Sequence, residues 1–385
     1  MNITNQNEWP SKEKLMKALE KALAKIDENL IKFDGAFPTR CAENLVYDIE
    51  GNRSWTNGFW PGIIWLAYEL TGDKKYSDAA MSYIDNFLER IEKKLFVNHH
   101  DMGFLYSLSC IPAVMHYNDE RAKKACVLAA DHLSKRFMEK GQFLNAWSRI
   151  EDIKPENNFY IVDCLMNTPF LYRVSEMTGD DKYKKIADAH VATTVKTIMR
   201  EDNSTNHSVL FDLETGNVIG GRTQQGFSDD STWSRGQSWA VLGFPLNYSY
   251  SKNPDNIVSF ERATRYFVDH LPKDYVPFWD FIYTDGDDQA RDSSAAAIAV
   301  CGILEMSKYR DGELMDEYLS YGAKMMHSLI DNYAPADDVK TDGLLLRGTG
   351  AATINMGVDV PNIWGDYYYL EAITRLLKPD WKIYW

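Results

Sequence analysis

The sequence predicts an all-α fold, an (α/α)6 barrel of six inner and six outer helices, built from one domain over residues 1–385. Three observations lead to this prediction. Amphipathic segments alternate along the chain with segments that are apolar on most sides, six of each. No linker rich in Pro, Gly or Ser divides the chain. Alternating β-branched runs, which are typical of strands, hardly occur outside short loops such as residues 208–221.

The amphipathic segments place apolar residues at helical spacing against faces rich in Lys and Glu, so we expect each to form an outer helix. They lie near residues 12–33, 75–92, 120–138, 181–199, 255–271 and 312–333. The other six segments are apolar or aromatic on most sides, which indicates helices that are buried all round. These predicted inner helices cover residues 58–70, 102–117, 163–177, 235–250, 292–309 and 365–377.

A weak internal repeat supports the pairing of inner and outer helices. The sequence YELTGDKKYSDAA follows the first inner segment, and the similar SEMTGDDKYKKIADA ends the third. In both, Gly would end one helix and Asp would cap the next. Repeated helix pairs bury their apolar faces against neighbours. A linear solenoid is the alternative, but its repeats are usually shorter and more regular. A closed ring also explains inner helices that are apolar on nearly every side.

Composition and charge exclude several classes of partner. The net charge of −14 argues against binding to nucleic acid or to an anionic membrane surface. A local Arg or His can still make a pocket that accepts a small anion. The 11 Trp, 22 Tyr and 17 Phe suit stacking against sugar rings or a large aromatic core equally well. We expect a monomer or a weak homo-oligomer.

The start of the chain shows no secretory signal, and no stretch has the length of a membrane span. The cysteines are odd in number and widely spaced, which fits neither a disulfide framework nor a CxxC metal site. We therefore expect a protein of the reducing cytoplasm. Cys164 stands next to Asp163, but its surroundings favour a packed thiol over a nucleophile. The cysteines are Cys41, Cys110, Cys126, Cys164 and Cys301.

Polar and aromatic loops precede four inner segments, and in a barrel they would meet at one rim. Asp101 and Asp163 lie in two of these loops and are the candidates for general acid–base catalysis, which glycoside hydrolysis commonly assigns to two carboxyl groups. Asp163 lies in the apolar run YIVDCLMN, where desolvation would raise its pKa. The alternative is that both residues only cap helices. The apolar neighbourhood favours function for Asp163.

Other polar and aromatic residues near the rim allow two interpretations each. Arg235 could bind a substrate carboxylate or form a structural ion pair, and Trp239 could stack on a sugar or pack in the core. Trp55 and Trp147 carry the same two interpretations. His99 and His100 are adjacent, with no HxxxH or HExxH spacing, so we expect them to line the rim rather than to bind a metal. We expect neither a metal nor another cofactor.

Five motifs occur in order over essentially the whole chain. They are Trp55–Gly62 (WTNGFWPG), His100–Phe104 (HDMGF), Ile161–Asp163 (IVD) with Asn167, Trp233–Trp239 (WSRGQSW) and Gly365–Ala372 (GDYYYLEA). Each motif alone is weak, but together they resemble the unsaturated glucuronyl hydrolases of glycoside hydrolase family 88. The resemblance implies an (α/α)6 barrel that removes the 4,5-unsaturated glucuronic acid that polysaccharide lyases leave at a non-reducing end.

The resemblance also implies a mechanism, the hydration of a vinyl ether. Asp163 would donate a proton to C4 of the double bond and then take one from the water that adds to C5. Asp101 would bind ring hydroxyls and help to keep Asp163 protonated. His207 is included among the expected site residues only because of this resemblance. The residues that we expect to bind the substrate are Trp55, His100, Trp147, His207, Gln225, Arg235 and Trp239.

The substrate is expected to be an unsaturated disaccharide of the glycosaminoglycan type. In some relatives that act on sulfated glycosaminoglycans, Ser and Lys precede the last motif, whereas residues 357–364 here (GVDVPNIW) contain neither. We therefore expect a preference for unsulfated disaccharides. Alternatives are an unsaturated rhamnogalacturonyl hydrolase acting on pectin fragments, an inverting (α/α)6 glycosidase acting on saturated glycans, and a sugar-binding protein without activity.

Overall fold

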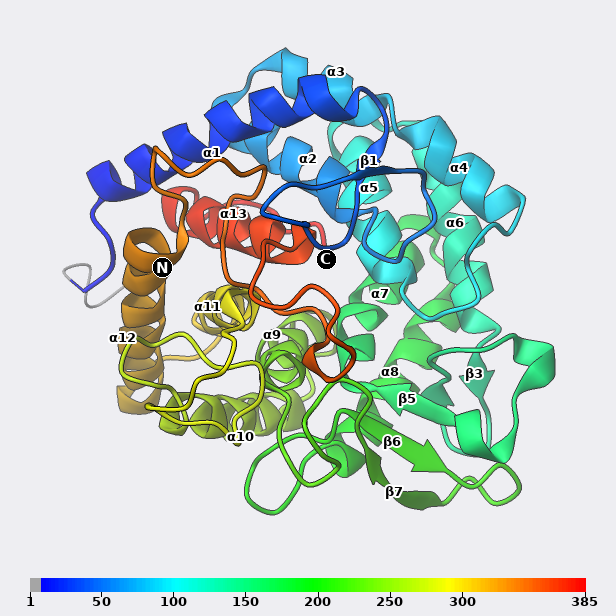
Figure 1. Ribbon diagram of the computed structural model, residues 1–385. Coiled ribbons are helices and arrows are strands. Elements are labelled where there is room, and N and C mark those ends of the chain that lie inside the picture. Colours follow the sequence, from blue (N-terminus) through cyan, green and yellow to red (C-terminus); the bar gives the residue numbers. More distant parts are fainter. Residues whose placement is uncertain (1–7) are drawn as a thin grey trace.

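The computed structural model describes residues 8–385, and an inner ring of helices forms its centre. Each inner helix contacts the next one along the chain, and α13 contacts α2, so the ring is closed (Figure 1). This closure confirms the barrel and rules out the linear solenoid. The inner helices are α2 (Phe59–Thr71), α5 (Met102–Tyr117), α7 (Thr168–Thr178), α9 (Ser234–Ser251), α11 (Ser293–Met306) and α13 (Ile363–Leu377).

The outer ring differs from the prediction at one place. The expected outer helix over residues 75–92 is two helices, separated at Ser82 and Tyr83. The ring of Tyr83 is buried at this break, where its hydroxyl accepts a hydrogen bond from Trp60 and donates one to the carbonyl of Ala36. The outer helices are α1 (Lys12–Phe33), α3 (Lys74–Met81), α4 (Ile84–Glu92), α6 (Glu120–Ser134), α8 (Asp181–Thr197), α10 (Asp255–Asp269) and α12 (Glu313–Ser328).

The two repeated Thr-Gly-Asp sequences form the predicted junctions between inner and outer helices. Gly72 and Gly179 end α2 and α7 with φ angles of 70° and 73°, a conformation that glycine adopts without steric cost. Asp73 caps α3 and Asp180 caps α8, each through a side-chain oxygen that accepts a backbone N–H two residues later. The repeat therefore marks the positions at which the chain passes from the inner ring to the outer ring.

The predicted loop over residues 208–221 is in fact a β-hairpin. Its strands β6 (Ser208–Phe211) and β7 (Val218–Arg222) pair antiparallel, and β5 (Phe159–Ile161) adds to the other side of β6. Two smaller antiparallel pairs join β1 (Phe37–Pro38) to β2 (Ile49–Glu50) and β3 (Phe137–Met138) to β4 (Phe143–Leu144). The three-stranded sheet matters for the site because β5 leads directly into Asp163.

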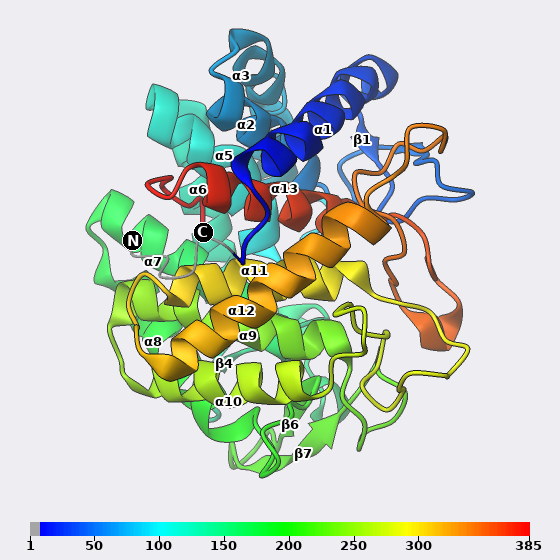
Figure 2. The same cartoon turned by 90° about the vertical axis from the view of Figure 1, so that its left-hand side faces the viewer.

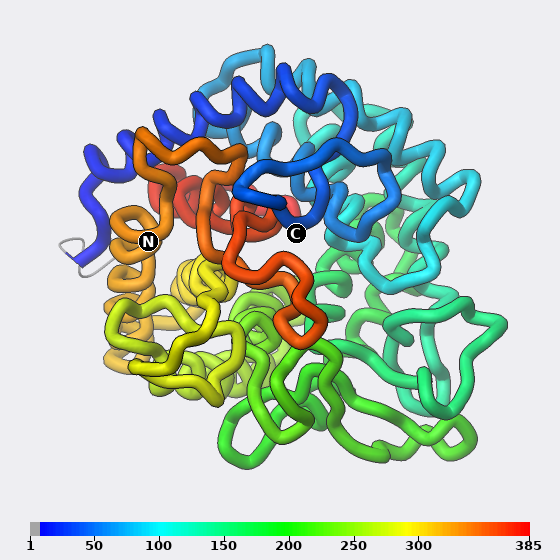
Figure 3. Tube along the Cα trace, viewed as in Figure 1, coloured from blue at the N-terminus to red at the C-terminus, as the bar shows by residue number. Residues whose placement is uncertain are grey.

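The two ends of the barrel differ. Long loops and the small sheets gather at the end where the inner helices begin, and the carboxyl-terminal residues lie at the other end (Figure 2). The trace of the chain after Arg347 crosses in front of the inner helices at the loop end (Figure 3). At the opposite end Tyr384 and Trp385 are buried, and Trp385 stacks on Tyr368. Among the described residues no helix is both long and apolar enough to cross a membrane.

Candidate active site

Asp101 stands at the N-cap position of α5, yet its carboxylate makes no capping hydrogen bond. Asn167 takes over that role from another element, because its Oδ1 accepts hydrogen bonds from the backbone N–H of Gly103 at 2.7 Å and of Phe104 at 3.4 Å. A Cβ on Gly103 would lie 2.7 Å from the Cα of Asn167, so only glycine allows this approach. The Asp101 carboxylate is therefore free for other contacts.

Asp163 lies in a 3₁₀ turn, η3 (Val162–Met166), and not at the start of an α-helix. The inner helix predicted from residue 163 begins only at Thr168, because Pro169 is favoured in the first turn of a helix. The alternative that Asp163 is a helix cap is therefore wrong. The side chain of Asn167 is also 3.4 Å from the carbonyl of Asp163, and so it links η3 to the start of α5.

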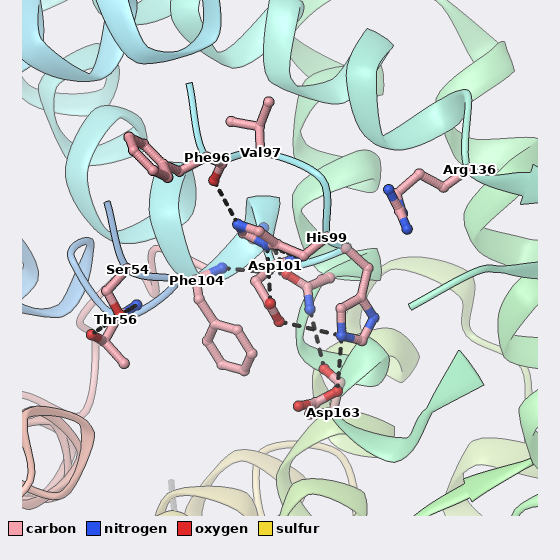
Figure 4. A network of polar contacts seen from close by, with 12 residues as sticks. Ser54, Thr56, Phe96, Val97, His99, Asp101, Phe104, Arg136 and Asp163 are labelled. Atoms are coloured by element: carbon pink, nitrogen blue, oxygen red, sulfur yellow. Dashed lines mark hydrogen bonds and ion pairs between the residues drawn. The ribbon is translucent and has the colours of Figure 1, made fainter. Parts of the chain in front are cut away.

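His100 lies between the two carboxyl groups. Its Nε2 is 3.3 Å from Oδ1 of Asp101 and 3.3 Å from Oδ1 of Asp163. The imidazole is fully buried, whereas the side chain of Asp163 keeps 15% of its surface exposed. Figure 4 shows Asp101 and Asp163 turned toward the same polar cluster, with the guanidinium of Arg136 to one side. Sequence spacing gave no sign that His100 would bridge the pair.

The surroundings favour different charges on these three groups. Burial, assisted by the negative charge of Asp101, raises the pKa of Asp163 well above its ordinary value. Burial also acts to raise the pKa of Asp101, but the contacts with His100 and His99 and the charge of Arg136 outweigh it and lower that pKa. Burial lowers the pKa of His100 to about 4. The arrangement favours a protonated Asp163 next to an ionised Asp101 and a neutral imidazole.

Arg235 makes a buried ion pair, which is one of its two predicted roles. Its Nη1 lies 2.5 Å from Asp292 and also donates to the carbonyl of Thr349, and its Nη2 donates to Gly350 and to Oε1 of Gln225. The same guanidinium lowers the pKa of Asp163 in part, although burial outweighs it. Arg235 therefore holds the loop around residue 349 and orients Gln225. Its role toward a substrate carboxylate stays a prediction.

A row of rings connects the other predicted residues. Trp55 stacks on Trp364 with ring centroids 5.5 Å apart, and the guanidinium of Arg235 lies 5.0 Å from the ring of Trp364 and 4.5 Å from that of Trp233. Trp233 in turn contacts the ring of His207 at 4.4 Å. The row therefore brings Trp55, Arg235 and His207 together at the barrel end that carries the carboxyl pair.

His207 reaches the site because β6 pairs with β5. The backbone N–H of Val162 donates to the carbonyl of His207, which places His207 beside the start of η3. Its Nδ1 is close to the N–H groups of Gln224 and Gln225 and to the hydroxyl of Thr223, while its buried Nε2 has no hydrogen-bond partner. The free Nε2 could form a hydrogen bond with a bound substrate.

The two remaining tryptophans have different surroundings. Trp239 is almost fully buried between Phe104 and Tyr368, which favours its packing role. Trp147 is 36% exposed, and its backbone forms a bridge with His99, next to the carboxyl pair. Of the two, Trp147 has the surface that stacking on a sugar requires.

Several contributors to the site were missed from the sequence. Asp292, Trp364 and Arg136 carry no motif of their own, and their contacts come from segments far apart in the chain. Asn167 was part of a motif but had no role. Cys164 is fully buried and burial raises its pKa well above the ordinary value, so it is the packed thiol that we predicted.

An open groove lies elsewhere among the described residues. It measures about 610 Å³ and runs between α1 and residues 330–344. Two lysines that line it, Lys14 and Lys21, are already paired with Asp331 and Asp337. The carboxylates of Asp331 and Asp337 are thus engaged in ion pairs with lysines, unlike the carboxyl pair at the barrel rim.

An (α/α)6 barrel that carries a carboxyl group with a raised pKa beside one with a lowered pKa, among tryptophans at its loop end, has the arrangement that glycoside hydrolysis needs. The comparisons agree. The family model for Glycosyl Hydrolase Family 88 matches residues 29–377. The chain belongs to this family and is a glycoside hydrolase.

Individual relatives are similar over almost their whole length. The unsaturated chondroitin disaccharide hydrolase of Streptococcus pneumoniae is 43% identical over 97% of this chain and 94% of its own. The crystal structure of the unsaturated glucuronyl hydrolase of Streptococcus agalactiae has a TM-score of 0.95 at 41% identity, covering 98% of this chain and 95% of that one. A variant of the latter, with asparagine in place of an aspartate, was solved with dGlcA-GalNAc6S, at a TM-score of 0.87, 39% identity and coverage of 98% and 94%.

Proposed function

We propose that this chain removes the 4,5-unsaturated glucuronic acid from the non-reducing end of lyase-generated glycosaminoglycan-type oligosaccharides, with residues 1–385 as one catalytic domain. The observation that carries the proposal is the asymmetry of the carboxyl pair. A vinyl ether needs an acid to protonate its carbon, and burial beside Asp101 raises the pKa of Asp163. The names of the relatives support the glucuronyl group over the pectin-derived alternative.

Asp163 performs both proton transfers in the proposed mechanism. Its carboxyl proton goes to C4, which leaves positive charge shared between C5 and the ring oxygen. A water molecule attacks C5 and gives its proton to the Asp163 carboxylate, which restores the acid. The resulting hemiketal opens and releases the next sugar. Overall one water is consumed and one glycosidic bond is broken, with no change in oxidation state.

Neighbouring residues support this cycle. Asp101, ionised 3.3 Å from the imidazole of His100, stabilises positive charge near the sugar and keeps Asp163 protonated between turnovers. Trp147 offers an exposed ring on which the sugar can stack, and the free Nε2 of His207 can bond the substrate. Gln225 is oriented by Arg235, which donates a hydrogen bond to its Oε1.

The substrate is proposed to be unsulfated. Within residues 357–364 the charged side chain is Asp359, which pairs with Arg347 at 2.9 Å, so this segment offers a carboxylate rather than a cation. A sulfate group would find no lysine there. We expect a higher kcat/KM for unsulfated unsaturated chondroitin or hyaluronan disaccharides than for their 6-sulfated counterparts, measured by loss of the ultraviolet absorbance of the double bond.

The decisive experiment compares wild type with Asp163→Asn in the same absorbance assay. Asparagine keeps the shape of the side chain but cannot carry the proton, so kcat should fall by roughly 10²–10⁴-fold or more. Asp188→Asn is a matched control, because Asp188 is a carboxylate on α8 that bonds Tyr172 and Lys184. A saturated glycan that is cleaved while the unsaturated disaccharide is not would overturn the proposal in favour of an inverting glycosidase.

A further inference from the structure

Three groups that can bind a metal ion converge at the rim. His100, Asp101 and Asp163 each offer one nitrogen or oxygen atom, and these atoms lie within 4.8 Å of one another. His100 and Asp101 come from the loop before α5, whereas Asp163 comes from η3, more than 60 residues later. The sequence therefore shows only an adjacent His-Asp pair, and the third group is supplied by the fold.

Two of the three spacings between the donor atoms fit a small tetrahedral ion. A zinc ion holds histidine nitrogen and carboxylate oxygen at roughly 2.0–2.2 Å, and atoms at the corners of such a tetrahedron are about 3.3 Å apart. Nε2 of His100 lies 3.3 Å from the Oδ1 atoms of both Asp101 and Asp163. One nitrogen and two oxygens would leave the fourth corner open.

The donor atoms are also available. Both nitrogens of the fully buried His100 lack a hydrogen-bond partner, and so does Oδ1 of Asp163. Buried polar atoms without partners are rare, because leaving them so costs free energy. Arg136 is a cation near Asp101, and two of its guanidinium nitrogens are bonded to the carbonyls of Asn145 and Ser148, while its Nη1 has no partner. Zinc binding would displace the carboxyl proton of Asp163 to the solvent, and the two carboxylates would then neutralise the divalent ion.

We propose that His100, Asp101 and Asp163 bind one Zn²⁺ ion, which inhibits the enzyme by occupying the place of the unsaturated sugar. The mixed nitrogen and oxygen ligands favour zinc over Mg²⁺, which prefers six oxygen ligands. The cysteines in the described residues are all buried, so they do not compete for the ion. Zinc binding does not depend on the proposed function, whereas the inhibition rests on it.

The first measurement is zinc binding itself, on protein without a purification tag, by competition with a fluorescent zinc chelator. We expect one zinc per chain, and an affinity lower by roughly tenfold or more in both His100→Gln and Asp163→Asn. His116→Gln is the matched control, since His116 has one carboxylate neighbour, Glu69 at 2.9 Å, and should bind zinc as wild type does. Circular dichroism checks that the variants are folded.

The second measurement is inhibition. Zinc should raise the apparent KM for the unsaturated disaccharide without changing kcat, a chelator should restore the rate, and Mg²⁺ should have no effect. The proposal fails if wild type takes up no zinc, or if His100→Gln and Asp163→Asn bind it as tightly as wild type. If the chain does not cleave the unsaturated disaccharide, the chelator measurement still decides whether the site binds zinc.

Discussion

Two buried ionic clusters lie at opposite ends of the barrel, and they differ in their cations. At the rim, Asp163 touches a neutral imidazole and burial raises its pKa. At the end of the barrel that holds the carboxyl-terminal residues, here called the closed end, Glu305 lies 2.5 Å from Arg375. Burial acts to raise the pKa of Glu305, but Arg375 and Lys308 outweigh it and lower that pKa. A buried carboxyl group thus keeps its proton, as the acid proposed at Asp163 must, or becomes a structural anion, according to whether a cation is in contact with it.

Breaking the closed-end cluster should have the largest effect, and on stability. Arg375→Met leaves Glu371 buried without its cation and Glu305 with Lys308 alone, which should lower the free energy of unfolding by about 3–5 kcal/mol. Urea-induced unfolding measures the loss. Arg265→Met is the control, because Arg265 pairs with Glu317 at the surface and should contribute less than about 1 kcal/mol. Equal losses in both variants would contradict the comparison.

Loosening the rim cluster should act on catalysis instead. Asn167→Ala removes the link between the start of α5 and η3, so the positions of the two carboxyl groups relative to each other are no longer fixed. The kcat should therefore fall about 100-fold, with KM little changed. The pH at which activity declines should also move. Asn247→Ala is the matched control, since Asn247 holds the carbonyl of Leu165 at the far side of the same turn. If it lowered kcat equally, Asn167 would have only a structural role.

The pH dependence should report the coupling between the two aspartates. In the proposed mechanism, activity needs a protonated Asp163, whose pKa is raised, and an ionised Asp101, whose pKa is lowered. The rate should therefore fall as pH rises through the pKa of Asp163 and as pH falls through that of Asp101. In Asp101→Asn the alkaline limb of the residual rate should move down by about one pH unit. An unmoved limb would show that burial alone sets the pKa of Asp163.

The smallest expected effect is a gain in stability at the rim. Because its folded pKa is raised, the stabilising contribution of Asp163 is present below its unfolded pKa of about 3.9 and is lost as pH rises. Asp163→Asn escapes this loss, so its Tm should exceed that of wild type by about 1–3 °C, and by more at pH 8 than at pH 5. Thermal melts at both pH values measure the difference.

Asp366→Asn provides the contrast for that measurement. Burial raises the pKa of Asp366 to about 7, but its oxygens accept hydrogen bonds from Tyr47 and from the backbone N–H groups of Leu344 and Leu345. Asparagine cannot replace all of these acceptors, so its Tm should fall. A lower Tm for Asp163→Asn as well would mean that the rim carboxyl is structural.

The rings of helices were predictable because each helix carries its own periodic pattern. The position of Asp163 in an apolar run likewise pointed to its raised pKa. Contacts between segments were not predictable in this way. That Asn167 caps α5, that His100 bridges both aspartates and that Arg235 pairs with Asp292 depend on the rotation of helices about the ring, which no local pattern encodes. The split of the outer helix at Tyr83 has the same origin, a contact with Trp60.

The contact of α13 with α2 has a consequence for how the chain is made. During synthesis the first inner helix leaves the ribosome about 300 residues before its last neighbour, so one of its flanks stays uncovered for most of translation. Closing so distant a pair is slow because of the entropy of the intervening chain. The uncovered apolar face of α2 is thus the segment to which a chaperone would bind. A chain that stops before α13 would expose this face permanently.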